Sequence, residues 1–179
     1  MVISGRSVYK DKLEQSIANN KLTLHSHPLS DKLANNYFVT GDGYVCDNST
    51  IIDKGVLKTL LLGIYGANKT GGKRSVNGGG AHIVEPGDKS LKDIISSTNK
   101  GVLLSRFSGG SPSDNGDFSG VAKNSYYIEN GEIKHPVSET MVSGNICKML
   151  HDIKNISKET VNFGYCIYPW IQFSGITIS

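Results

Sequence analysis

Turn residues set the strongest constraint on how this chain can fold. Residues 50–62 contain two strand-like runs on either side of Gly55, and residues 125–134 contain two more on either side of Asn130-Gly131. Asn-Gly between strand residues is the strongest short-range hairpin signal, and glycine supplies the positive φ that such turns need. Glycine makes up 21 of the 179 residues, about 12%, against an average of about 7%. We therefore expect many short strands joined by tight turns, although two similar hairpins do not establish a repeat.

Short helices are expected between these strands. The pattern predicts one helix over residues 7–20, a second over 90–101, and a third that Asn145 caps, with apolar residues at i, i+3, i+4 and i+7 from Ile146. Further strands are predicted at 21–27, 37–39, 82–85, 102–104, 170–173 and 176–178. Because strands and helices do not alternate strictly, a doubly wound parallel sheet is disfavoured. The expected class is α+β, a mainly antiparallel β-sheet or barrel-like domain with about three short helices.

Composition excludes several classes of protein. No apolar run approaches the roughly 20 residues of a membrane-spanning helix, and the first residues lack the long apolar region of a signal peptide. The three cysteines, Cys46, Cys147 and Cys166, are too few and too scattered for a disulfide framework and suit a reducing cytoplasm. The net charge of +3 is mild, so neither nucleic-acid binding nor membrane binding is expected.

No complete active site can be read from the residues alone. The glycine-rich segment 70–80 fails as a phosphate-binding loop, because Arg74 interrupts the motif and a strand follows instead of a helix. It is either a flexible surface loop or a backbone wall for a peptide or anion, and the first alternative is favoured. His25 and His27 lie on one face of a predicted strand but lack further metal ligands, so ordinary polar positions are favoured. Ser119 does not stand in a nucleophile elbow.

Several ordered segments resemble a known family. They are Gly116-Asp117-Phe118-Ser119-Gly120, the run from Tyr127 to Ile133, Pro136-Val137, the run from Met141 to Asn145, and residues 51–57, 65–69, 77–82 and 174–179. From about residue 20 to the last residue, their order resembles the C-terminal domain of the TldD/PmbA family. Members of this family are candidate modulators of DNA gyrase. Residues 77–82 are closer to the PmbA/TldE-like side. The chain is thus expected to be one domain, 1–179, without the family's N-terminal domain.

The resemblance implies a role in cytoplasmic proteolysis. Family members form a metalloprotease that acts on small or unfolded peptides; one subunit binds zinc through a His-Glu-x-x-x-His helix and the PmbA/TldE-like subunit lacks it. This chain also lacks the motif, whose segment would lie just before residue 1. The implied partners are a TldD-like subunit or a second copy, and a peptide. Zinc is implied for the assembled complex and no cofactor for this chain alone. The alternatives are a peptide- or protein-binding module without protease activity and a hydrolase with a spatial Cys–His pair.

The same resemblance suggests where a peptide would lie. No catalytic residue is assigned. Gly79 and His82 belong to one glycine-rich segment of the family, Asp117 and Phe118 to the other, and all four are expected to line a peptide cleft. Cys166 lies in the stretch that matches a third zinc ligand of the metal-bearing subunit. Without two accompanying histidines, a structural role is favoured for it.

Overall fold

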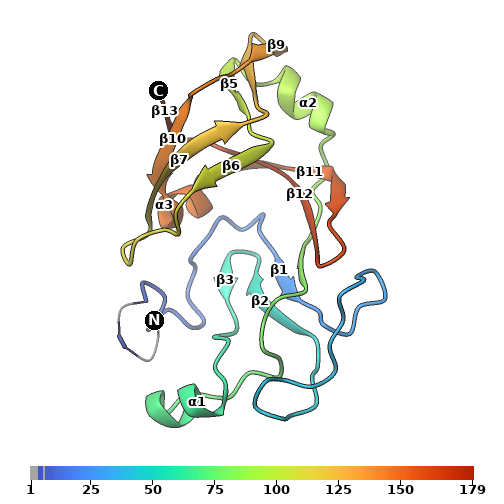
Figure 1. Ribbon diagram of the computed structural model, residues 1–179, viewed down its shortest axis with the longest axis vertical. Helices are drawn as coiled ribbons and strands as arrows, with labels where there is room; N and C mark the ends of the chain where they lie inside the picture. Colours follow the sequence, from blue (N-terminus) through green and yellow to red (C-terminus); the bar gives the residue numbers. More distant parts are fainter. Residues whose placement is uncertain (1–3, 6) are drawn as a thin grey trace.

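The computed structural model describes residues 4, 5 and 7–179, and its elements confirm the α+β class with mainly antiparallel sheets (Figure 1). The helices are α1 (Ile64–Thr70), α2 (Leu91–Ser96) and α3 (Ile146–His151). The strands are β1 (Leu24–Ser26), β2 (Ser49–Asp53), β3 (Val56–Leu57), β4 (His82–Val84), β5 (Lys100–Leu103), β6 (Arg106–Gly109), β7 (Asp117–Lys123), β8 (Tyr126–Glu129), β9 (Glu132–Pro136), β10 (Met141–Asn145), β11 (Ile153–Asn162), β12 (Cys166–Phe173) and β13 (Thr177–Ile178).

These strands form three sheets. The largest has the order β11-β12-β4-β1-β2-β3, the second β13-β10-β7-β6, and the third β5-β8-β9. All neighbouring strands are antiparallel except β12 and β4, which run parallel. In Figure 1 the strands β1 to β3 and α1 make the lower half, and the two smaller sheets lie in the upper half. The described strands leave the sheets open, so the domain is not a closed barrel.

The hydrophobic core joins the large sheet to the segment before it. A cluster of buried side chains includes Ile17, Leu22, Ile52, Leu57, Val84, Ile153 and Ile156. Fully burying one such side chain contributes about 1.5–3 kcal/mol, so this cluster is a main source of stability and holds β1 to β3 against β11. None of the helices in the described part of the chain is long and apolar enough to span a membrane.

Both predicted hairpins are present, and their turns explain why glycine is needed. Lys54 and Gly55 have φ of 45° and 81°, and Asn130 and Gly131 have φ of 51° and 78°. Two consecutive residues with positive φ match the type I′ turn, whose twist fits the flanking strands. A Cβ at Gly131 would also lie 2.5 Å from the carbonyl oxygen of Ser96, so this position excludes larger residues on two grounds.

The predicted helix over residues 7–20 is wrong. Glu14 has a φ of 61°, and its amide donates to the Leu57 carbonyl at 2.8 Å. The Leu57 amide donates to Gln15, and the Ile17 amide donates to the Gly55 carbonyl. These long-range bonds satisfy the backbone through the β2–β3 hairpin, so helical bonds within the segment do not form.

Two other elements differ from the prediction. Helix α1 was not predicted, and it begins just after the strand-like run that ends at Leu62. Gly63 offers no side-chain cap, but Asp42 accepts from the Ile64 amide at 2.8 Å across 22 residues of sequence. The predicted strand 37–39 is reduced to a single bridge between Val39 and Val45.

The second and third helices are present with their predicted caps but are shorter than expected. Helix α2 ends at Ser96, with Lys100 and Gly101 in β5, and α3 ends at His151, with Ile153 beginning β11. The Ser90 hydroxyl accepts from the Asp93 amide at 3.0 Å. The Asn145 side chain accepts from the amides of Cys147 at 3.1 Å and Lys148 at 3.3 Å. Such caps satisfy amides that the first turn of a helix leaves without partners.

Candidate functional site

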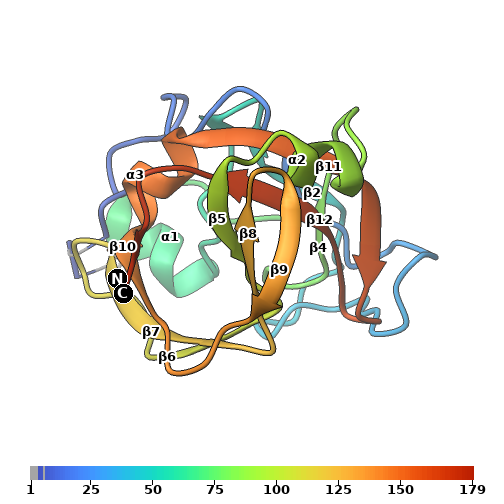
Figure 2. The same cartoon turned by 90° about the horizontal axis from the view of Figure 1, so that it is seen from above.

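A large cavity lies in the upper half of the molecule. Its volume is about 1140 Å³, and its wall is mainly apolar, with Phe107, Phe118, Ile128, Val142, Trp170 and Phe173 among the residues that line it. Seen from above in Figure 2, β5, β8, β10, β7 and β12 stand around this region. Pockets for small ligands usually occupy about 300–1,000 Å³ with mostly apolar walls, so the size and chemistry suit an organic ligand or an apolar chain segment.

Phe118 is the predicted cleft residue that lines this cavity. It lies on β7, is partly buried, and meets the Phe107 ring edge to face with centroids 5.8 Å apart. Such aromatic pairs add about 0.5–1.5 kcal/mol beyond their burial. Phe118 is therefore held in a fixed position in the cavity wall.

Asp117, the next residue back along β7, has a different environment. It is exposed and outside the cavity lining, and its carboxylate accepts from the amide groups of Asn145 and Asn115, both at 2.8 Å. The hydrogen bond from Asn145, followed by that from Asn115, lowers the pKa of Asp117. Because Asn145 caps α3, Asp117 supports the start of that helix.

Gly79 lies in a fixed loop between α1 and β4. Its carbonyl accepts from the Tyr37 hydroxyl at 2.6 Å, and its amide donates to the Asn77 side chain at 3.0 Å. The buried Asn77 side chain also bonds Ser26 and Ser49, which lie on β1 and β2. Residues 77–80 are thus tied to the sheet, which matches a backbone wall better than the favoured expectation of a flexible surface loop.

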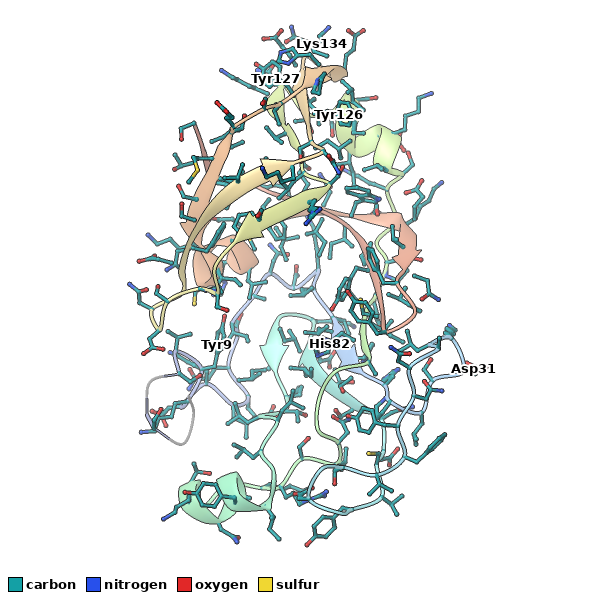
Figure 3. All side chains as sticks on the ribbon, in the orientation of Figure 1. Tyr9, Asp31, His82, Tyr126, Tyr127 and Lys134 are labelled. Atoms are coloured by element: carbon teal, nitrogen blue, oxygen red, sulfur yellow. The ribbon has the colours of Figure 1, made fainter. Side chains whose placement is uncertain are left out.

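His82 begins β4 near the centre of the molecule (Figure 3). Its Nδ1 lies 3.4 Å from the Tyr168 hydroxyl, and burial lowers its pKa, which favours the neutral ring. His82 and Cys166 occupy partner positions in the parallel β4–β12 pair, so the structure brings these two predicted residues together. Tyr168 lines the large cavity, and His82 therefore contacts one of its wall residues.

Cys166 does not fit a zinc site formed by this chain alone. It is 1% exposed and lies beside Tyr168, whose pKa is raised to about 12 by burial and by the nearby Cys166 thiol. A catalytic zinc needs three protein ligands, whereas across residues 4, 5 and 7–179 no three His, Cys, Asp or Glu side chains gather around one point. The deep burial of the thiol also disfavours it as the nucleophile of a Cys–His pair.

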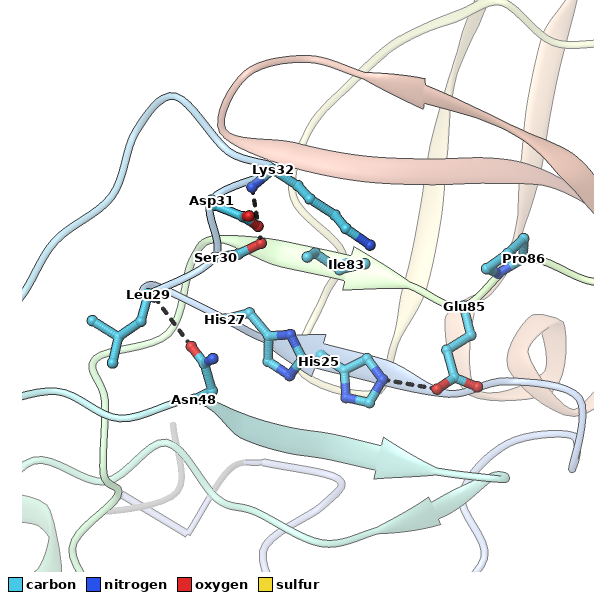
Figure 4. A pocket seen from close by; sticks show the side chains of 10 residues that line it. All are labelled: His25, His27, Leu29, Ser30, Asp31, Lys32, Asn48, Ile83, Glu85 and Pro86. Carbon is cyan, nitrogen blue, oxygen red and sulfur yellow. Dashed lines mark hydrogen bonds and ion pairs between the residues drawn. The ribbon is translucent and has the colours of Figure 1, made fainter.

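A second, smaller pocket of about 490 Å³ surrounds His25 and His27 (Figure 4). Their rings stack with centroids 4.5 Å apart, and burial, followed by the charge of His25, lowers the pKa of His27. Both nitrogens of His25 already have partners, Thr50 at 3.0 Å and Glu85 at 3.1 Å. This arrangement agrees with the favoured expectation that the pair are ordinary polar residues.

Sequence reasoning missed the residues of β5 and β12 that line the large cavity, among them Trp170 and Gln172. Their apolar pattern predicts buried strands. The same pattern is expected for the wall of a cavity and for a filled core, so it cannot distinguish the two. The single tryptophan of the chain is the one compositional feature that could have directed attention to β12.

The chain is similar to known proteins along nearly its whole length. The PmbA/TldA metallopeptidase C-terminal domain matches residues 1–179. A metalloprotease PmbA of Escherichia coli O157:H7 is 30% identical over 189 residues, covering 97% of this chain and 41% of the relative. A zinc metalloprotease TldD homolog of Saccharolobus solfataricus is 31% identical over 129 residues, covering 65% of this chain and 29% of the relative.

Solved structures agree with these relatives. A protein of Bacteroides thetaiotaomicron described as a candidate modulator of DNA gyrase superposes with a TM-score of 0.89 at 30% identity, covering 99% of this chain and 41% of that one. TldE of Thermococcus kodakarensis superposes with a TM-score of 0.82 at 25% identity, covering 99% and 44%. The chain therefore spans less than half the length of the relatives it matches here. On these matches, it belongs to the PmbA/TldA metallopeptidase C-terminal domain family.

Proposed function

We propose that this chain is a PmbA/TldE-like component of a metalloprotease that acts on small or unfolded peptides, and that it is not catalytic on its own. Likeness along 97–99% of the chain to PmbA and TldE proteins carries this proposal. On the neighbouring strand, His82 is the register partner of Cys166. These two residues give two metal donors, which are too few for a catalytic zinc. The metal ligands would then come from a TldD-like partner subunit.

The role assigned to this chain is to hold the peptide. The large apolar cavity supports it, because an unfolded peptide offers apolar side chains that a folded protein buries. Phe118 would contact the peptide directly, and His82 would act through Tyr168, which it contacts. Gly79 and Asp117 do not line the cavity and would act indirectly. Gly79 would fix the glycine-rich loop before β4, and Asp117 would fix the start of β7 against Asn145.

Recovery of the chain from its native lysate tests the assignment. The tagged chain is expected to co-purify with a protein that carries His-Glu-x-x-x-His, identified by mass spectrometry. A bait that carries the tag alone separates recruitment by this domain from adhesion to the resin. If the wild-type chain repeatedly purifies alone, or if the isolated chain hydrolyses peptides by itself, the proposal fails.

A further inference from the structure

The large cavity has an unusual charge pattern for an apolar site. The charged side chains among its lining residues are Lys100 and Lys154, and no aspartate or glutamate lines it. Both lysines are exposed, and neither forms an ion pair within 4.0 Å in the described part of the chain. An apolar wall with two cations at its rim is complementary to a ligand with an apolar body and an anionic group.

Two strand edges face the same cavity. Six consecutive residues of β12, from Tyr168 to Phe173, line it, as do the consecutive residues 100–104 that include β5. Successive side chains of a strand point to opposite faces, so a cavity against one face would be lined by every second residue. Consecutive lining residues mean that the backbone of β12 and β5, and not one side-chain face alone, borders the cavity.

These edges have backbone groups to offer. Strand β5 ends its sheet, with β8 as its one neighbour among the described strands. Strand β12 pairs with β11 on one side, but on the other side β4 pairs with it only at Cys166 and Ile167. Beyond Ile167, Pro169 has no N–H and the Trp170 amide already donates to the Ser157 hydroxyl at 2.8 Å, so this edge offers mainly carbonyl groups. An added extended chain can donate its amides to these carbonyls, and strand addition is a common mode of peptide recognition.

Both lysines lie at the same end of this free edge. Lys154 is on β11, between the residues that pair with Phe173 and Gln172. Lys100 follows Thr98 by two residues, and the Thr98 hydroxyl accepts from the Gln172 side chain at 2.9 Å. The two lysines thus lie where β12 ends and the cavity meets solvent. Glu129 is the register partner of Lys100, and the Asp152 carboxylate lies beside Gly175, so the lysines act as local cations on a rim that also carries acids.

We infer that the cavity binds the C-terminal end of an extended apolar peptide, with its carboxylate near Lys100 and Lys154 and its backbone along the free edge of β12. The peptide would run parallel to β12, in line with β4, which is parallel to β12 and occupies the same edge at Cys166. Its apolar side chains would fill the cavity beside Phe118 and Trp170. This inference rests on the proposed function and names the class of peptide that the site would hold.

Fluorescence of Trp170 provides the assay, because it is the single tryptophan of the chain and lines the cavity. The full chain is titrated with the peptide Ala-Leu-Phe-Leu carrying a free C-terminal carboxylate and with the same peptide amidated. Hydrogen bonds to charged groups correspond to about tenfold in affinity or more, so the free acid is expected to bind about tenfold more tightly. Saturable binding with no preference for the acid, or no change in emission with either peptide, overturns the inference.

Variants locate the carboxylate. Lys100→Met with Lys154→Met keeps most of the side-chain length and removes the charges, and it is expected to reduce the acid-to-amide preference to less than about twofold. Lys158→Met is the matched control, because Lys158 lies on the same strand as Lys154 but does not line the cavity, and it is expected to keep the preference. Circular dichroism checks that each variant is folded. A preference that survives in the double variant overturns the assignment.

Two further probes separate a peptide from an acyl chain. A peptide with N-methylated amides is expected to bind about tenfold more weakly, because it cannot donate to the edge of β12. Decanoate carries a carboxylate and an apolar tail but no amides, and it is expected to bind more weakly than the peptide acid. Tight decanoate binding with no effect of N-methylation would mean a fatty-acid site. These measurements need no protease partner, so they can fail while the proposed function stands, or succeed while it fails.

Discussion

Replacing Asn77 by alanine is expected to destabilise the fold strongly, because one side chain ties the glycine-rich loop to two strands. Asn77 is 2% exposed. Its Oδ1 accepts from the Ser26 hydroxyl and the Gly79 amide, both at 3.0 Å. Its Nδ2 has the Ser49 hydroxyl oxygen and the Asp47 carbonyl as its nearest acceptors, at 2.8 and 2.9 Å. Nδ2 carries two hydrogens, so four good hydrogen bonds are the realistic total.

The magnitude follows from these four bonds. A hydrogen bond within a protein contributes about 1 kcal/mol net, so Asn77→Ala is expected to lower the free energy of unfolding by about 4 kcal/mol. That is a large part of the roughly 5–15 kcal/mol of a typical domain. Asn77→Asp keeps the shape but replaces the two N–H donors with a buried charged acceptor that faces the Asp47 carbonyl oxygen. It is therefore expected to cost at least as much as the alanine variant.

Urea unfolding followed by circular dichroism measures both variants. Asn35→Ala is the matched control, because Asn35 is exposed and its side chain makes no hydrogen bond to the described residues, and its effect is expected within about 0.5 kcal/mol. A loss below about 1 kcal/mol for Asn77→Ala would refute the view that this network fixes the loop. If Asn77→Ala lowers the free energy of unfolding but Asn77→Asp does not, the shape of the side chain matters and its N–H donors do not.

Three further predictions concern turns, thiols and pH. Gly131→Ala is expected to cost about 2 kcal/mol and lower Tm by about 4–8 °C, because of its positive φ and its close neighbours, whereas Gly110→Ala, with open space around it, leaves Tm unchanged in differential scanning fluorimetry. Maleimide labelling of the native chain followed by mass spectrometry is expected to modify Cys147 first, since the other two cysteines are buried; equal rates would contradict this. The stabilisation from Asp117, whose pKa is lowered on folding, is complete above about pH 4 and is lost as the pH falls further. Asp117→Asn should therefore flatten the acid limb of a stability–pH curve, and an unchanged limb would count against the bonds to Asn145.

Local signals in the sequence predict the parts of this fold that depend on local bonds. The Asn130-Gly131 turn and the Asn145 cap act on residues within four positions, and both are present as expected. Residues 7–20 and α1 fail for the opposite reason. Residues 7–20 give amides to the β2–β3 hairpin, and the start of α1 depends on Asp42. Because these partners lie far away in the sequence, they leave no periodic pattern in it.

The candidate site is less predictable than the fold. Of the four expected cleft residues, Gly79 and His82 lie at the start of β4 or just before it, Asp117 and Phe118 lie on β7, and Phe118 lines the large cavity. Most of the other wall residues come from 91–104 and 168–178, whose apolar pattern predicts burial, and the rest include Phe107, Ile128 and Val142. Periodicity shows which face of a strand is apolar. Whether that face borders a cavity or a filled core depends on how the three sheets are arranged, which periodicity does not show.

Peptide hydrolysis by purified components tests the central claim, that this chain holds peptide for a metal-bearing partner. An unfolded peptide substrate is incubated with the chain, with the His-Glu-x-x-x-His protein that co-purifies with it, and with both. The account predicts turnover by the mixture that exceeds the sum of the separate proteins, that a chelator abolishes, and that falls when the chain carries Phe118→Ala. Hydrolysis by the chain alone, or full turnover by the partner without it, would contradict the account.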